Sequence, residues 1–369
     1  MDDFTSQYDT VLSDVHLLRP AGRHLVTRLN GAGQPVFRSR FRFLPDRDGS
    51  APGSGPERPE DAADTPEHTG QDVDPVLDED GDLEVSHRPR TEPEHQVISP
   101  IILHQSDSGP EQQDADGDAS AADAITIEHT MATPLGDVGK QIWRAALLLA
   151  DFILSEPGRF AGATVLELGA GTGVSSIVMA TAAKTVYCTD VGADLLRMCS
   201  RNVTLNQHLT RGEVRVRHLD WLRPDLRTDA GVFSWTQEEE EHLYAHTSAI
   251  VAADVCYDDR LTDAFFRTVS RLCSRFGRLC SIYVSIEKRM NFSLRRLGVA
   301  CEAYDHFRRC VSRLRAGPSS FSAQRLRTGF PQALRYERVQ QLELWEITAR
   351  PGSPLHTDMA AAAPQAGTS

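Results

Sequence analysis

Residues 163–173 read Ala-Thr-Val-Leu-Glu-Leu-Gly-Ala-Gly-Thr-Gly, an apolar run with one acid followed by three glycines at alternate positions. The run predicts a buried strand that breaks into a glycine-rich turn and then a helix. Backbone N–H groups and the positive end of the helix dipole face a ligand at such a turn. The segment therefore predicts a site for a nucleotide-like ligand.

Around this segment, strands and helices alternate from about residue 124 onward. The apolar pattern predicts helices at Gln141–Leu154 and Arg260–Phe276. Strands are predicted at 164–168, 185–189, 214–219, 249–253, 279–285 and 342–347. Alternating strands and helices imply an α/β fold, with a mostly parallel sheet covered on both faces.

The first 44 residues are expected to form a small β appendage. Short β-like stretches occur at 11–18, 24–29 and 36–43, with Asn30-Gly31 as a hairpin-type turn between the last two. Pairing partners for them are expected at 97–103 and 125–127. The domain boundaries predicted from these patterns are 1–44, 45–123, 124–350 and a disordered tail at 351–369.

Residues 45–123 form an acidic segment. Between residues 45 and 124 there are 22 Asp and Glu against four Arg and no Lys, a charge of −18. Few aromatic residues and so high a charge predict disorder for most of it. Because the whole chain carries −13, the remainder is mildly basic at +5.

Cysteine usage and hydropathy limit the class of protein. The seven cysteines form no C-x-x-C pair and lie mostly in apolar patterns, which favours reduced thiols. The sequence has neither an N-terminal apolar leader nor a run of 18 apolar residues. We therefore expect a protein that is neither secreted nor membrane-spanning.

The spacing of the glycines selects among nucleotide-like ligands. A dinucleotide fingerprint requires G-x-G-x-x-G, whereas here position 174 is Val and the third glycine, Gly173, comes one residue early. An acid, Glu167, two residues before Gly169 suits a ligand that carries an ammonium and a carboxylate. A glycine-rich turn without a ligand is the alternative.

Three further acids end predicted strands. Asp190 is placed to accept both ribose hydroxyls of an adenosine, or to cap a helix. Asp220 could accept from an adenine amine while Trp221 covers the ring, or both could be ordinary turn residues. Asp254 and Tyr257 are expected to face the reactive end of the ligand and receive a substrate, with turn capping by Asp254 as the alternative.

Together, the glycine turn and the D-x-x-Y at 254–257 resemble the family-16 seven-strand S-adenosylmethionine-dependent protein lysine methyltransferases, over residues 124–348. The resemblance implies a Rossmann-like seven-strand sheet and S-adenosylmethionine as methyl donor, with S-adenosylhomocysteine as product and no metal. It implies catalytic roles for Asp254 and Tyr257. The implied cofactor-binding residues are Trp143, Glu167, Gly169, Gly171, Gly173, Asp190, Asp220, Trp221 and Ala253.

The resemblance also implies a partner and a reaction. The substrate would be a lysine of a protein, with a nucleic-acid-associated, Kin-type zinc-finger protein as one candidate, in the nucleus or cytosol. We expect Asp254 to orient the incoming ammonium, and an aromatic ring, Trp143 or Tyr257, to lie near the sulfonium. We further expect a monomer without direct membrane or nucleic-acid binding, since Arg308-Arg309 and the arginines of 313–327 fit a solvated helix face.

The amino-acid sequence is also compatible with two other functions. One is a methyltransferase that acts on a small molecule or a nucleic-acid base, although base-modifying relatives typically carry an Asn-Pro-Pro-Tyr-like motif where this chain has Asp254-Val-Cys-Tyr257. The other is a donor-binding scaffold without turnover, in which residues 1–120 recruit a partner.

Overall fold

The computed structural model describes residues 10–14, 25–30, 33–43, 124–227, 231–293, 298–316 and 321–350. The predicted acidic segment 45–123, including the expected strand at 97–103, and the tail 351–369 lie outside these residues.

Seven strands form the central sheet, in the order β13-β14-β10-β9-β6-β7-β8. Strands β10, β9, β6, β7 and β8 are parallel, and β14 runs antiparallel between β10 and β13. The predicted α/β class with a mostly parallel sheet is confirmed, and the strand that ends at Ala253 pairs with the glycine-bearing strand. The strands are β6 Thr164–Leu168, β7 Thr185–Asp190, β8 Glu213–His218, β9 Thr247–Ala253, β10 Cys280–Glu287, β13 Phe321–Leu326 and β14 Leu342–Ala349.

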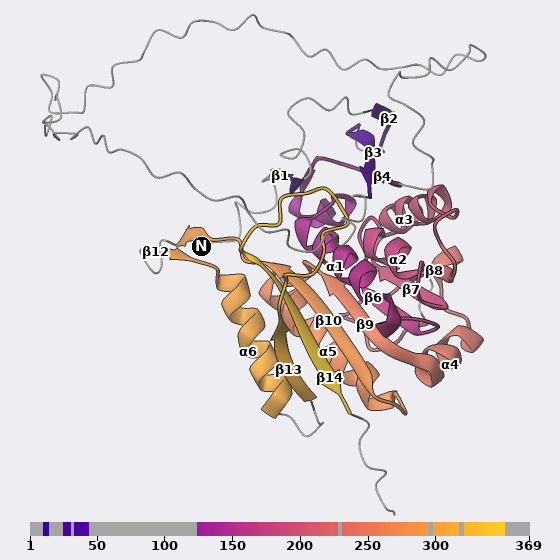
Figure 1. Ribbon diagram of the computed structural model, residues 1–369, viewed down its shortest axis with the longest axis vertical. Coiled ribbons are helices and arrows are strands. Elements are labelled where there is room, and N and C mark those ends of the chain that lie inside the picture. The colour runs from indigo at the N-terminus through magenta and orange to yellow at the C-terminus, as the bar shows by residue number, and fades with distance from the viewer. Residues whose placement is uncertain are drawn as a thin grey trace, which may run out of the picture. The chain divides into compact units, whose positions relative to one another are not determined.

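Helices cover both faces of this sheet (Figure 1). Adjacent residues of β6 point to opposite faces, so Val165 packs in the apolar cluster of α1 and α2, whereas Leu166 packs in that of α4, α5 and α6. Helix α3 packs against β7 and β8 through Leu196 and Cys199. The helices are α1 Arg144–Ser155, α2 Val174–Met179, α3 Ala193–Leu205, α4 Gln237–His246, α5 Asp259–Arg275 and α6 Glu302–Ala316, with short 3-10 turns η3 Leu135–Lys140, η4 Pro157–Arg159 and η5 Gly231–Phe233.

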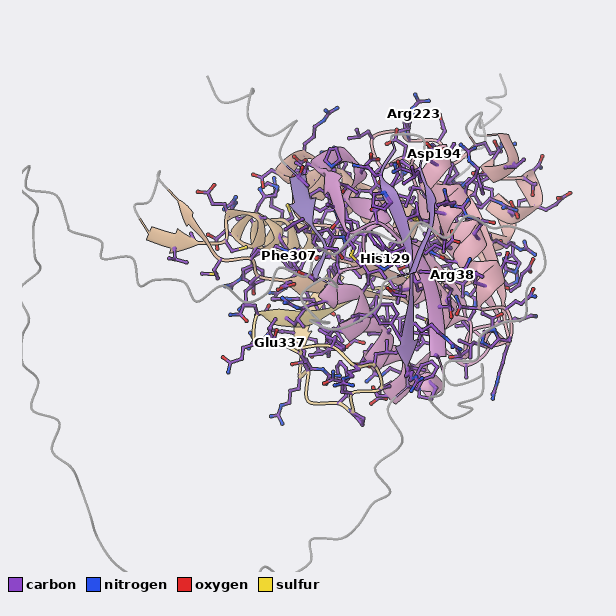
Figure 2. The ribbon with its side chains drawn as sticks, turned by 90° about the horizontal axis from the view of Figure 1, so that it is seen from above. Arg38, His129, Asp194, Arg223, Phe307 and Glu337 are labelled. Carbon is purple, nitrogen blue, oxygen red and sulfur yellow. The ribbon has the colours of Figure 1, made fainter. Side chains whose placement is uncertain are left out.

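The N-terminal strands join the residues that follow the acidic segment. Strands β2 Leu25–Leu29, β3 Pro35–Arg42 and β4 Ala124–His129 form an antiparallel sheet, which confirms the expected pairing of 36–43 with 125–127. A short pair joins β1 Thr10–Leu12 to β5 Ala132–Pro134. Figure 2 marks Arg38 of β3 and His129 of β4, whose ring nitrogen lies 2.8 Å from the Ser39 hydroxyl. The expected β appendage is thus built with a strand from beyond residue 123.

One asparagine ties this small sheet to the glycine turn. Asn202 of α3 is fully buried, and its Oδ1 accepts from the Glu128 N–H at 2.7 Å. Its Nδ2 donates to the carbonyls of Glu128 and Thr172, both at 2.9 Å. Because Thr172 lies inside the glycine turn, β4 and the turn are held by the same side chain.

Three expectations require correction. The helix predicted from Gln141 begins at Arg144, because the Gln141 side chain instead donates to Val11 O and to the Thr133 hydroxyl. The strand predicted at 11–18 covers only Thr10–Leu12, and residues 15–24 lie outside the described part. The basic stretch 313–327 is not one helix face: α6 ends at Ala316, and β13 follows as an edge strand with half of its residues exposed.

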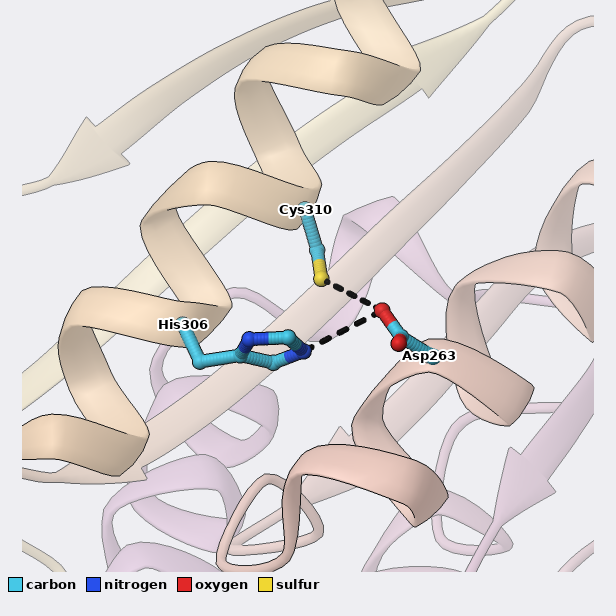
Figure 3. Close-up of side chains that lie close together, drawn as sticks. All are labelled: Asp263, His306 and Cys310. Carbon is cyan, nitrogen blue, oxygen red and sulfur yellow. Dashed lines mark hydrogen bonds and ion pairs between the residues drawn. The ribbon is translucent and has the colours of Figure 1, made fainter.

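A cluster of polar side chains holds α6 against α5 (Figure 3). Oδ1 of Asp263 lies 3.1 Å from Nε2 of His306 and accepts from the Cys310 thiol at 3.3 Å. Arg313 donates to the same oxygen at 2.8 Å. The Arg313 guanidinium therefore supplies the positive charge beside Asp263. The hydrogen bonds of this cluster join α5 to α6.

All seven cysteines are free thiols, as predicted. Among the helices in the described part of the chain, none has both the length and the apolar character needed to cross a membrane. Two short strands, β11 Asn291–Ser293 and β12 Gly298–Ala300, pair between β10 and α6.

Candidate functional site

A cavity of about 600 Å³ lies at the carboxyl ends of β6, β7, β8 and β9. Its walls include ten of the eleven residues singled out from the sequence: Trp143, Glu167, Gly169, Gly171, Asp190, Asp220, Trp221, Ala253, Asp254 and Tyr257. The remaining one, Gly173, does not line it. Parallel strands end at one edge of the sheet, which brings these distant segments together.

The glycine turn is shaped by close approach of the backbone. Gly171 has a φ of +55°, and a Cβ on it would lie 2.9 Å from the Gly139 carbonyl oxygen. The η3 segment, including Gly139, thus lies directly over the turn and forms one wall of the cavity. This wall has no recognisable motif in the sequence, although Gly136 and Gly139 mark a segment where backbones could approach closely.

Gly173 has a different role. It has a φ of +87°, precedes the first residue of α2, and faces the sulfur of Cys199, which would lie 2.7 Å from an added Cβ. The third glycine therefore allows α3 to pack against the turn instead of contacting the cavity.

Asp190 is held by the turn that it faces. Its Oδ2 accepts from the Gly171 N–H at 2.8 Å, and its Oδ1 accepts from the Val191 N–H at 2.7 Å. Burial raises the pKa of this carboxyl, although the two backbone donors oppose the shift. Each carboxylate oxygen has a second lone pair available to accept from a hydroxyl in the cavity.

Glu167 is the most deeply buried acid of the site. Its side chain is 1% exposed and accepts a short hydrogen bond from the Ser176 hydroxyl. Burial raises its pKa to about 7, despite the hydrogen bond from Ser176. The carboxyl is therefore poised between its neutral and charged forms, and a cation in the cavity would favour the charged one.

Asp220 and Trp221 follow the end of β8. Oδ1 of Asp220 accepts from the Leu222 N–H at 2.9 Å, which shapes the turn and leaves the side chain on the cavity wall. The Trp221 ring packs edge-on against the Phe265 ring, with the ring centroids 5.5 Å apart. It also lies against Gly169, where an added Cβ would be 3.2 Å from the ring. Both residues thus have a structural contact and a face toward the cavity.

Asp254 has an unusual backbone conformation at the end of β9. Among the described residues other than glycine it alone has a positive φ, of 58°. Its N–H donates to Ser285 O of the neighbouring strand at 2.8 Å, which holds the residue in place. A non-glycine residue in this region stores strain of about 1–3 kcal/mol and is found disproportionately at functional sites.

The carboxylate of Asp254 is already paired with a cation. Arg289 donates to both of its oxygens, to Oδ1 at 2.9 Å, and the Asp254 side chain is only 5% exposed. Asp254 therefore has a cationic partner that the sequence did not predict, and its role in orienting an acceptor ammonium stays a prediction. The Cζ atom of Arg289 also lies 4.9 Å from the centroid of the Trp143 ring, so the cation–π partner of that ring is an arginine.

Arg289 was missed because it follows β10 by two residues, in a segment with no motif of its own. Only the topology could have indicated Arg289. The strand predicted at 279–285 belongs to the same parallel sheet, so residues that follow its carboxyl end lie at the edge of the sheet where the cavity is. Tyr257, which lines the cavity at the other side of Asp254, is 43% exposed. Burial of the hydroxyl and nearby Asp190 raise the pKa of Tyr257 to about 12, so it stays a neutral phenol.

Comparison with known proteins identifies relatives of this chain. A family model described as a lysine methyltransferase matches residues 120–297. The chain is 50% identical to methyltransferase-like protein 22 of Homo sapiens, over 95% of this chain and 97% of that protein. It is 27% identical to protein-lysine N-methyltransferase EEF2KMT of Mus musculus, over 42% of this chain and 47% of that protein. A solved O-methyltransferase from Bacillus cereus in complex with SAH aligns at 16% identity with a TM-score of 0.37, over 57% of this chain and 82% of that chain.

Proposed function

Because the chain belongs to the lysine methyltransferase family that includes methyltransferase-like protein 22, we propose that it transfers a methyl group from S-adenosylmethionine to a lysine side chain of a protein. The observation that carries this proposal is the convergence of Glu167, Asp190 and Asp254 on one cavity around the glycine turn.

The residues of the cavity fit the donor at both of its ends. Asp190, with a lone pair left on each oxygen, suits the two ribose hydroxyls. Glu167 provides a carboxyl beside the glycine turn that suits the ammonium of the methionine part. Asp220 and Trp221 lie on the cavity wall where a planar base would pack. The donor, when bound, supplies an activated methyl group on a sulfonium, so the protein must supply alignment and an uncharged amine.

Alignment is the contribution for which these residues are best arranged. Orienting two reactants in a near-attack geometry supplies up to about 7–11 kcal/mol in favourable systems. Asp254 and Tyr257 line the donor cavity, and the Asp254 N–H is hydrogen-bonded to Ser285 O of β10 directly after the paired part of β9. We therefore assign to these two residues the placement of the acceptor amine.

Incubation with tritiated S-adenosylmethionine and a cell extract tests the proposal. The wild-type protein is expected to label at least one protein band, and Asp254→Asn to label none. Asparagine is chosen because it tolerates a positive φ better than alanine does. Asp225→Ala, an exposed acid outside the cavity, serves as the matched control and should label as the wild type does.

Calorimetric titration with S-adenosylhomocysteine shows whether the Asp254→Asn protein retains its donor cavity. Label found only in nucleic acid or small molecules would favour a methyltransferase of another substrate class. No label at all from a protein that binds the donor would favour a scaffold without turnover, and either result would contradict the proposal.

A further inference from the structure

A second cavity, of about 320 Å³, adjoins the donor cavity. It lies between the carboxyl end of β10 and the start of α6, with walls formed by Ile286, Glu287, Arg289 and Tyr304. Asp254 and Tyr257 line both cavities. A side chain that entered through the second cavity would therefore meet the first one beside these two residues.

The charge of Asp254 presents a problem for an amine that arrives there. A free lysine has a pKa of about 10.4, so only about one molecule in a thousand is uncharged near neutral pH. An isolated carboxylate within about 4–6 Å raises the pKa of an amine further, because it stabilises the ammonium form. Asp254 by itself would thus bind the acceptor in the form that cannot attack a methyl group.

Arg289 changes this balance. The guanidinium is fixed from several sides: it pairs with both oxygens of Asp254, lies over the Trp143 ring, and has Glu287 at 3.5 Å and Asp14 at 3.7 Å. The Asp254 side chain is 5% exposed and that of Arg289 is 37% exposed, so the carboxylate is largely removed from water while the guanidinium beside it offsets its charge.

The remaining charged groups of the junction come from three other places in the chain. Glu287 ends β10, Arg144 begins α1 and lies 3.0 Å from Glu287, and Asp14 belongs to the N-terminal segment. Burial and the nearby charge of Asp14 raise the pKa of Glu287. Glu302, at the start of α6, lines the outer part of the second cavity. The negative charge of Glu302 would attract an ammonium to the second cavity. At the junction, the charge of Asp254 is offset by Arg289, so the amine would lose its proton there more readily.

We propose that Arg289 is a positioning residue for methyl transfer, which pairs with Asp254 at the junction of the two cavities so that the acceptor amine is held there uncharged. This inference rests on the proposed function. The lysine loses its proton to water on entering the junction. The uncharged nitrogen donates a hydrogen bond to the Asp254 carboxylate, and its lone pair forms the new N–CH₃ bond as the sulfonium S–CH₃ bond breaks.

The test is the pH dependence of methyl transfer by Arg289→Gln. Initial rates are measured on the most strongly labelled protein band, with saturating tritiated S-adenosylmethionine, between about pH 7 and pH 9.5. Losing one nearby cation should raise the apparent pKa of the rate profile by about one unit, so the variant should be about tenfold slower near pH 7.5 and recover at alkaline pH. Arg289→Lys keeps the charge without the bidentate pair and should recover part of the rate.

Two controls separate this effect from damage to the fold. Arg278→Gln removes an exposed arginine at the opposite end of β10 and should leave the profile unchanged. Calorimetric titration with S-adenosylhomocysteine should show about the same affinity for Arg289→Gln as for the wild type.

Three outcomes would overturn the inference. An equal loss of rate at every pH would show that Arg289 only supports the structure. A faster reaction of Arg289→Gln near pH 7.5 would show that Arg289 obstructs the acceptor. No labelled protein with the wild type would remove the proposed function and this inference together, whereas the first two outcomes leave the proposed function intact.

Discussion

The backbone N–H of Gly171 donates a 2.8 Å hydrogen bond to Oδ2 of Asp190, which joins the glycine turn to the end of the neighbouring strand β7. The other oxygen of the same carboxylate accepts from Val191 N–H. Asp190 is therefore preorganised by two backbone donors and needs no rearrangement to receive hydroxyl groups. Such preorganisation lowers the entropic cost of binding.

Asp190→Ala is expected to weaken binding of S-adenosylhomocysteine by about 30- to 100-fold. A hydrogen bond to a charged group contributes about 1.5–3 kcal/mol, and removing the carboxylate also releases the Gly171 N–H. Calorimetric titration of the variant measures this change, with Asp225→Ala as the control that should bind normally. An affinity of Asp190→Ala within about twofold of the wild type would show that this carboxylate does not receive the donor.

Gly171→Ala tests whether the turn requires glycine for its conformation or for its contact with Gly139. Gly162 offers a matched control: its φ is +68°, but nothing lies within 4 Å of an added Cβ. Both substitutions are expected to lower the free energy of unfolding by roughly 1–2 kcal/mol, because left-handed backbone disfavours alanine. Only Gly171→Ala should also lose donor binding, since its Cβ would lie 2.9 Å from the Gly139 carbonyl. Equal donor affinities in the two variants would contradict the importance of this close approach.

Glu167→Gln should become more stable relative to the wild type as the pH rises. The pKa of Glu167 is about 7 in the folded protein, above the value of about 4.5 expected when unfolded. Between these two values the unfolded chain loses a proton that the folded protein keeps, so the wild type loses stability with rising pH, by at most about 3 kcal/mol. Urea unfolding of both proteins near pH 5 and pH 8 measures the difference. If the two proteins differ in their free energy of unfolding by the same amount at both pH values, Glu167 ionises normally.

Asn202→Ala is expected to destabilise the protein and loosen the glycine turn together. The substitution leaves the Glu128 N–H and the carbonyls of Glu128 and Thr172 without their side-chain partner. Each buried unsatisfied group costs about 1–3 kcal/mol, so a loss of several kcal/mol is expected in thermal or urea unfolding. Gln207→Ala, which changes an exposed residue just beyond the end of α3, should have little effect. Unchanged stability of Asn202→Ala would show that water replaces these hydrogen bonds.

Much of the fold followed from local patterns. Strand β6 is buried along its whole length and is apolar except for Glu167 and Thr164, so its place in the centre of the sheet could be predicted from composition alone. The edge strand β13 could not, because half of its side chains are exposed and Arg325 gives it the look of a solvated surface. Pairing with β14 over six residues, a long-range interaction, defines it.

The amino-acid sequence by itself determined which residue types end the strands and where a glycine-rich turn follows, because both are read along a single segment. Together with the resemblance to a family, these patterns predicted ten residues that line the cavity. Only the tertiary structure decided the partners of those residues. Arg289 reaches Asp254 because β9 and β10 are paired in register, and Asn202 reaches Thr172 because α3 packs over the turn. Neither contact can be predicted from the sequence around Arg289 or Asn202, because the partner of each side chain comes from a distant segment that only the fold brings close.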